Sequence, residues 1–148
     1  MTGAALAVQT LRSLCALLSQ EHADAPVVAA SLGTIREDMG ENLPLFVKPS
    51  DSSFVTGQVV REYGKASVNQ VVLDVAPGDL RLKALEDAFD AFSPLRVLQA
   101  GQRPTMIFSV DTDAGRQHVC RILAEADGTL NDEAHVLRIT VTRDPRLD

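Results

Sequence analysis

The chain has 148 residues, of which 45% are hydrophobic and only 4% are aromatic, with no Trp. This length predicts one domain with an aliphatic core, and it argues against a protein that holds bases or sugars by aromatic stacking. Asp and Glu number 20 against 14 Lys and Arg, a formal net charge of −6, which argues against a general nucleic-acid-binding protein because such proteins need a positive surface.

The first predicted element is an amphipathic helix from Ala5 to Gln20. Its residues Leu11, Leu14 and Leu18 recur at helical spacing, with polar residues between them. Pro26 follows shortly, and it disfavours helical geometry in the residue before it. The helix is therefore expected to end before that proline.

Four short segments with extended or ambiguous patterns follow this helix. The last two are rich in β-branched residues or alternate between apolar and polar residues, which favours strands, although a weak helix stays an alternative for the third. Prolines lie in and after the second, which favours an edge strand or a loop, whereas the first fits a short helix and a strand equally well. The four segments are Val27–Gly33, Leu43–Val47, Phe54–Gly64 with a bulge expected at Gly57, and Val68–Val75.

A second amphipathic helix is predicted from Asp79, as its N-cap, to Phe92. Leu85, Phe89 and Phe92 fall on one apolar stripe of such a helix. The Ser-Pro pair at 93–94 is expected to end it.

Three acidic residues, Glu86, Asp87 and Asp90, lie off that stripe. Catalytic carboxylates need burial or a close like charge to shift their pKa values, and acids on a solvated helix face have neither. Lys83 precedes two of them at ion-pair spacing. We therefore expect these acids to be a solvated surface, neither catalytic nor metal-binding.

Three alternating segments at the end of the chain predict an antiparallel meander. The turn-forming stretch "DTDAGR" (111–116) between the first two predicts a hairpin. The predicted strands are Pro104–Thr112, Gln117–Glu125 and His135–Arg143.

The elements together predict an α+β fold: an antiparallel sheet with two main amphipathic helices on one face. Helix and strands follow in the same order in each half, which indicates a tandem α-β-β-β repeat with halves 1–76 and 77–148. We expect residues 1–148 to form a single domain.

A helix followed by a meander, as in "LKALEDAFDAF" and the strands after it, resembles the architecture of the beta-lactamase inhibitor protein and of small outer-membrane assembly lipoproteins. The element order also resembles the small acidic chaperones of type III secretion. These resemblances rest on topology and imply a role as inhibitor or chaperone. The first group is secreted, and the second usually closes with an amphipathic helix, where this sequence has a strand and "RDPRLD". No functional residue is carried over.

The two cysteines, Cys15 and Cys120, are expected to be small buried hydrophobic residues in a reducing compartment, since disulfide frameworks use more cysteines in shorter chains. The opening segment lacks a basic region, and Arg12 interrupts its apolar run, so it does not predict a signal peptide. No stretch is apolar enough for a membrane span. These observations predict a soluble, cytoplasmic protein.

The sequence has few groupings that point to chemistry. His118, Cys120 and His135 would give three zinc ligands if their strands paired in that register, and Cys120 with either histidine would give a catalytic dyad. A buried cysteine between strand-end histidines explains the same pattern. Nucleophile elbows and phosphate-binding loops are lacking. We therefore predict no catalytic residue, no metal and no cofactor.

One surface feature indicates binding. Arg121 and Arg138 are predicted to lie opposite the apolar rows of their strands, on the side of the sheet without helices, together with Leu123, Ile107 and Val119. Arginines among exposed aliphatic residues are typical of protein interfaces, and an antiparallel sheet also has an ordinary solvated side. Both interpretations stay open, and the partner would be another protein or a second copy of the chain.

The sequence therefore favours a non-enzymatic protein-binding or adaptor module, chaperone- or inhibitor-like, with Arg121, Arg138 and Leu123 as binding residues. The alternative is a small enzyme or ligand-binding domain with a pocket between helix and sheet. A purely structural domain of a larger assembly is a third interpretation. Neither nucleic acid nor a membrane is an expected partner.

Overall fold

The structure, a computed structural model, describes residues 3–20, 23–38, 40, 43–62, 67–97, 99–110, 118–128, 130–131 and 133–145. Within them the chain forms three helices and one eight-stranded antiparallel sheet, which confirms the predicted α+β class. In chain order the elements are α1 (Gly3–Leu18), α2 (Ala25–Leu32), β1 (Gly33–Asp38), β2 (Leu45–Pro49), β3 (Phe54–Arg61), β4 (Val68–Val75), α3 (Leu82–Ala88), β5 (Asp90–Arg96), β6 (Thr105–Val110), β7 (His118–Ala126) and β8 (Val136–Pro145).

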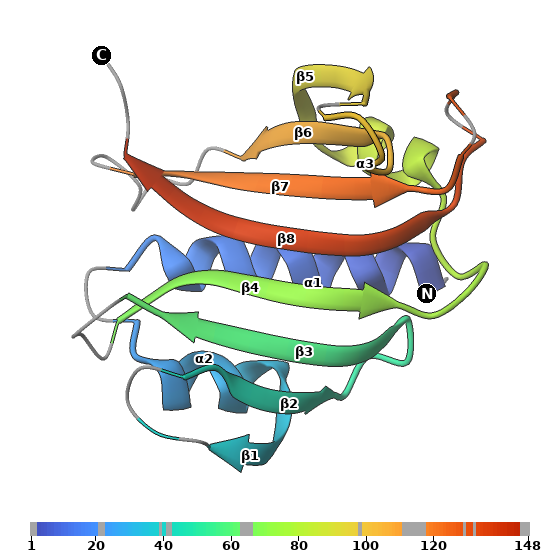
Figure 1. Cartoon of the computed structure of the whole chain (residues 1–148). Coiled ribbons are helices and arrows are strands. Elements are labelled where there is room, and N and C mark those ends of the chain that lie inside the picture. Colours follow the sequence, from blue (N-terminus) through green and yellow to red (C-terminus); the bar gives the residue numbers. More distant parts are fainter. Residues whose placement is uncertain are drawn as a thin grey trace.

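The strands lie in the order β1-β2-β3-β4-β8-β7-β6-β5, each antiparallel to its neighbours. Each half of the chain therefore places a four-stranded meander after its helices, and the two meanders join through β4 and β8 at the centre of the sheet (Figure 1). The sequence predicted three strands a half, because β1 and β5 were missed. That the two halves are related in sequence, as a true tandem repeat, remains a prediction.

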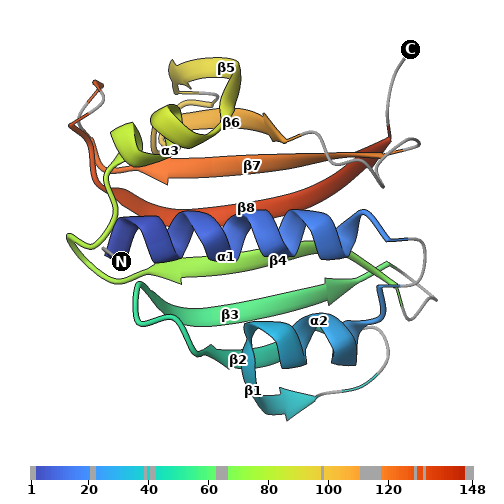
Figure 2. The same cartoon turned by 180° about the vertical axis from the view of Figure 1, so that it is seen from behind.

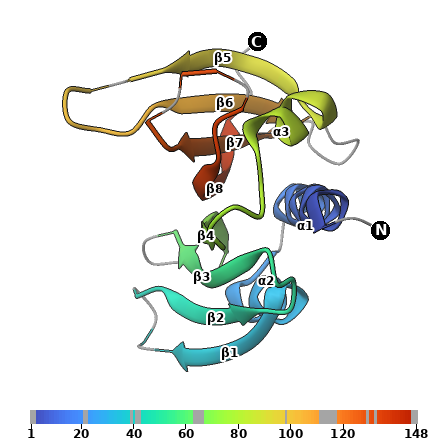
Figure 3. The same cartoon turned by 90° about the vertical axis from the view of Figure 1, so that its right-hand side faces the viewer.

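All three helices lie on one face of the sheet, as Figure 2 shows. Helix α1 runs along the centre and packs on β7 and β8, while α2 packs on β1, β2 and β3 and α3 packs against α1. The opposite side of the sheet, which we call the open face, has no described helix over it (Figure 3). The two sides of each strand therefore meet different surroundings.

The face under the helices is aliphatic because side chains alternate along each strand and paired residues point the same way. The residues of one such row are all buried, and the row crosses the six inner strands of the sheet, from β6 to β2. In order they are Phe108, Ile122, Val141, Val71, Val59 and Leu45. The apolar stripe of α1 packs on this face, with Leu11, Leu14 and Leu18 buried as predicted.

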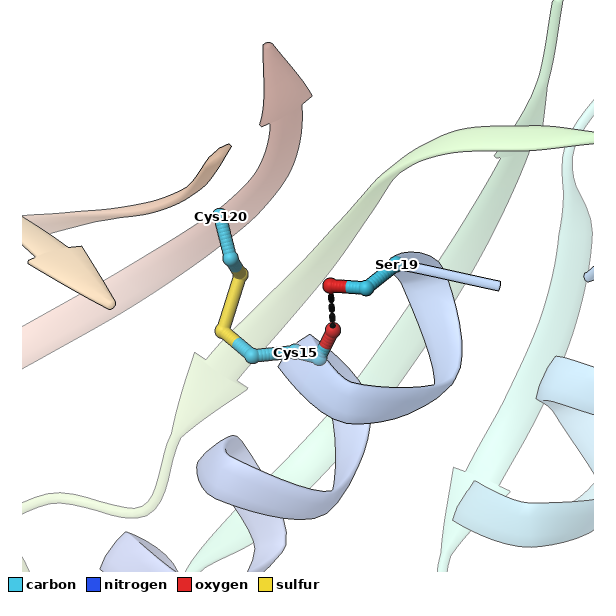
Figure 4. The surroundings of a disulfide bond; sticks show 3 residues. All are labelled: Cys15, Ser19 and Cys120. Carbon is cyan, nitrogen blue, oxygen red and sulfur yellow. Dashed lines mark hydrogen bonds between the residues drawn. A yellow bond between two sulfur atoms is a disulfide. The ribbon is translucent and has the colours of Figure 1, made fainter. Parts of the chain in front are cut away.

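The prediction that the two cysteines are not linked is wrong. Cys15 on α1 and Cys120 on β7 are buried, as predicted, but they form a disulfide across 105 residues of sequence (Figure 4). Their Cα atoms lie 5.5 Å apart, within the range that a disulfide spans. The apolar stripe of α1 brings Cys15 to the inward side of β7, so the bond ties the first helix to a strand of the second half.

The second helix is shorter than predicted. This predicted helix is α3, which follows Arg81 as its N-cap and ends at Ala88. Asp79, the predicted N-cap, lies in the preceding turn, where its amide donates to Ala76 O. Phe89 adopts an extended backbone, and the chain continues as β5, which pairs with β6. Phe92 then leaves the apolar stripe and is 61% exposed.

The ambiguous segment 27–33 is mostly helical, since α2 begins one residue before Pro26, which suits a first turn. Strand β1 follows immediately. A Cβ on Gly33 would lie 2.0 Å from Lys48 O, so only glycine allows the close approach of β1 to β2. Because β1 covers its outer side, β2 is not the predicted edge strand.

The remaining predicted strands are confirmed. β3 is a strand, as its β-branched residues predicted, although its irregularities lie at Phe54/Thr56 and Val60/Arg61 and not at Gly57. β4, β6, β7 and β8 occupy the predicted segments. The hairpin expected at 111–116 lies outside the described residues.

Candidate binding surface

The open face carries three rows of side chains, which follow from the pairing of the strands. Its middle row contains most of the partly exposed apolar residues of this face, and charged or polar rows lie on either side. The middle row is Ile107, Leu123, Thr140, Val72, Gln58 and Phe46. The charged row is Arg96, Thr105, Glu125, Arg138, Asp74 and Thr56. The polar row is Ser109, Arg121, Thr142, Gln70 and Val60.

Asp74 and Arg138 form the central contact of the charged row. Arg138 Nε donates to Asp74 Oδ1 at 2.9 Å, and Thr56 Oγ1 donates to Asp74 Oδ2 at 2.7 Å. Partial burial alone would raise the pKa of Asp74, but these hydrogen bonds, and the attraction of Arg138 and Arg103, hold that pKa below its usual value. The hydrogen bond to Asp74 in turn raises the pKa of Arg138.

The polar row contains a stacked arginine. The guanidinium carbon of Arg121 lies 3.6 Å from the centroid of the Phe92 ring, a cation–π contact between β7 and β5. Arg121 Nη1 and Oγ1 of its paired residue Thr142 are buried and have no hydrogen-bond partner among the residues that the structure describes. The stack holds a cation and an exposed aromatic ring together at one end of the open face.

A hollow of about 500 Å³ lies where the connection from β5 to β6 meets the open face. It is lined by residues 101–103 of that connection and by Thr105, Leu123, Glu125 and Thr140 of the sheet. Its walls therefore combine the middle and charged rows with the β5–β6 connection. That connection projects beyond the sheet (Figure 3).

A second hollow, of about 670 Å³, lies on the helix side between α1, α2 and the connection from β2 to β3. Its acidic residue, Asp51, is buried and already engaged: Oδ2 accepts from Thr10 Oγ1 at 3.0 Å, and Oδ1 accepts from the Ser53 amide at 2.9 Å. This carboxylate closes the turn before β3, and each of its oxygens already accepts a hydrogen bond within the fold.

The three predicted binding residues lie together on the open face. Leu123 is partly exposed in the middle row, and Arg138 and Arg121 lie in the rows on either side of it. Their neighbour Val119, which was expected to share this exposed surface, is 7% exposed and therefore buried. That these residues bind a partner stays a prediction.

The groups considered for chemistry lie apart. His118 is at the start of β7, opposite Pro145, whereas His135 lies beyond the far end of the β7–β8 pair, beside Asp127. Cys120, between them in the proposed zinc set, is bonded to Cys15. Within the described part of the chain, His, Cys, Asp and Glu side chains do not gather in groups that would hold a metal ion.

The acids of the second helix region are all exposed. Lys83 Nζ and Asp87 Oδ1 lie 3.5 Å apart, the predicted ion pair at a spacing of four residues. Glu86 and Asp90 are likewise at the surface. The expectation of a solvated acidic surface is confirmed.

Two residues of the surface were missed from the sequence. Phe92 was assigned to a core stripe, because the Ser-Pro pair at 93–94 was expected to end the helix only after it, whereas the helix ends at Ala88. Arg103 lies in a polar connection without periodicity, so its place over the open face follows only from the pairing of β5 with β6.

Comparison with known protein families, with curated proteins and with solved structures gives no match for this chain. Among the described residues, the helices are too short or too polar to cross a membrane.

Proposed function

We propose that the protein is a non-enzymatic binding module that contacts a partner protein through its open face. The observation that carries the proposal is the middle row, in which Ile107, Leu123, Val72 and Phe46 stay partly exposed between two polar rows. Apolar residues inside a polar rim are the usual composition of a protein interface.

The arginines support the same function. Arginine and aromatic residues are enriched among the residues that contribute most to protein binding. Arg121 lies against the ring of Phe92, a residue that is 61% exposed, and Arg138 is fixed by Asp74. Side chains held in this way lose less conformational entropy when a partner binds.

The alternative, an enzyme or ligand-binding domain with a pocket between helix and sheet, has less support. It requires polar groups that converge beneath the helices. The hollow between α1 and α2 contains one buried acid, Asp51, and both of its oxygens already accept hydrogen bonds. His118 and His135 lie far from one another along the sheet.

The compartment is part of the proposal. The sequence predicted a cytoplasmic protein, but the Cys15–Cys120 disulfide favours an oxidising compartment, because disulfides seldom persist where thiols are kept reduced. Alkylation of the protein in lysate from its natural source, followed by mass measurement, should find neither cysteine labelled. Labelling of both cysteines would contradict the disulfide and support the cytoplasmic location that the sequence predicted.

The test of the function is capture by matched variants. Leu123→Asp with Arg138→Ala should abolish partner capture from native lysate, or lower the mass of a self-associated species in light scattering. Val27→Asp, on the exposed side of α2 where Val27 is 53% exposed, is the matched control and should leave capture and mass unchanged. Equal behaviour of both variants would remove the open face as the binding surface.

A further inference from the structure

We propose that the hollow between the β5–β6 connection and the open face binds a small zwitterion, whose carboxylate lies at Arg103 and whose ammonium group lies at Glu125. This site is additional to the protein-binding function proposed above and does not depend on it. The proposal comes from two charged side chains of opposite sign that line one cavity without engaging each other.

Arg103 is the cation of this site. It is exposed on the β5–β6 connection, lines the hollow, and has no hydrogen bond or ion pair among the described residues. Its backbone carbonyl accepts from Thr105 Oγ1 at 3.3 Å, and Pro104 O accepts from the Ala126 amide at 2.8 Å. The backbone at Arg103 is therefore anchored to the sheet, while its guanidinium stays available to bind a ligand.

Glu125 is the anion. Its side chain is partly buried in the hollow, and it too lacks a hydrogen bond or ion pair in the described part of the chain. The nearest partner along its row, Arg138, is bound to Asp74 at 2.9 Å. Glu125 thus keeps a carboxylate without a direct hydrogen bond or ion pair among the described residues, although it attracts the neighbouring Arg138 at longer range.

The two charges together define the class of ligand. A simple anion would be attracted by Arg103 but repelled by Glu125. A simple cation would be attracted by Glu125 but repelled by Arg103. A molecule with both charges satisfies both side chains with charge-assisted hydrogen bonds. The volume of about 500 Å³ is within the range of small-molecule sites, and Leu123 supplies an apolar surface beneath the aliphatic part of such a ligand.

The experiment is a titration of the purified chain with amino acids of increasing length, followed by amide NMR. Glycine, 4-aminobutanoate and 6-aminohexanoate vary the separation of the charges, and hexanoate and hexylamine are the singly charged controls. We expect one zwitterion to shift the amides of Gly101, Gln102 and Leu123, and to bind at least about tenfold more tightly than either control. Equal binding of hexanoate, or no binding of any zwitterion, would overturn the proposal.

Variants assign the two ends of the ligand. Arg103→Gln and Glu125→Gln should each weaken the zwitterion about tenfold, and Glu125→Gln should strengthen hexanoate while Arg103→Gln strengthens hexylamine. Arg103→Lys should keep most of the affinity, because it keeps the positive charge. A loss in Arg103→Gln alone would then come from the missing charge and not from a folding defect. Arg96→Gln, on the adjacent strand and outside the hollow, should change nothing, and an effect as large as that of Arg103→Gln would also contradict the site.

Discussion

The two faces of the sheet are made by the same strands and differ in almost every property. On β7, Cys120 and Ile122 point to the helices and are at most 2% exposed, while Arg121 and Leu123, which alternate with them, stay partly exposed on the open face. One face therefore holds the apolar contacts and the disulfide that stabilise the fold. We expect the other, whose side chains are mostly partly exposed, to contribute less to stability.

The largest effect should come from removing the bond that joins helix to sheet. Replacing Cys15 and Cys120 together by Ala should lower the free energy of unfolding by about 4 kcal/mol, since the bond closes a loop of 105 residues and restricts the unfolded chain. Denaturant unfolding measures it, with reduced wild-type protein as the control. An unchanged unfolding midpoint would mean that the packing of the helices on the sheet does not depend on the disulfide for its stability.

Neighbouring residues on β7 test the comparison within one strand. Ile122→Ala should cost about 3 kcal/mol, because Ile122 is fully buried in the core and its loss leaves a cavity. Leu123→Ala should cost less than about 1.5 kcal/mol, because Leu123 keeps contact with water. Similar losses in urea unfolding would show that the open face also supports the fold.

A glycine at the edge of the sheet should give a smaller, local effect. Gly33→Ala should cost about 1–2 kcal/mol, because the added Cβ would lie 2.0 Å from Lys48 O and push β1 away from β2. Amide exchange should become faster in β1 and stay unchanged in β4. Unaltered exchange in β1 would indicate that the backbone absorbs the clash without losing the pairing.

The smallest effect should come from the charged row. The folded state lowers the pKa of Asp74, so its ionised form stabilises the protein above the unfolded pKa, and this stabilisation is lost as the pH falls through the folded pKa. Asp74→Asn should therefore cost less than about 1 kcal/mol at pH 7, since the side chains of Arg138 and Asp74 are 45% and 41% exposed and water weakens their attraction. The difference from wild type should begin to shrink near the unfolded pKa of about 4 and vanish once the pH lies below the lowered folded pKa, and a difference that grows on acidification would contradict this assignment.

The sequence predicted the parts of the fold that repeat a local pattern. The α1 stripe with Leu11 and Leu14, and the alternation in β4, β7 and β8, identify their own elements because burial on one side imposes the period. These patterns were enough to predict the α+β class and to place Arg121, Arg138 and Leu123 on one side of the sheet.

The parts that were missed lack such a pattern. Strand β1 is exposed along nearly all of its length, so its sequence "GTIRED" shows no alternation, and β5 follows a helix whose stripe extends to Phe92. The disulfide and the position of Arg103 depend on contacts between residues far apart in sequence. Local periodicity carries no information about such contacts.

The most direct test of the division between the faces is hydroxyl-radical footprinting of the protein alone and in the complex that wild-type bait recovers. We predict that bound partner protects Phe46, Ile107 and Leu123 on the open face, while Leu6 and Val27 on the helices stay as reactive as in the free chain. Protection of the helix residues with an unprotected open face would contradict the account.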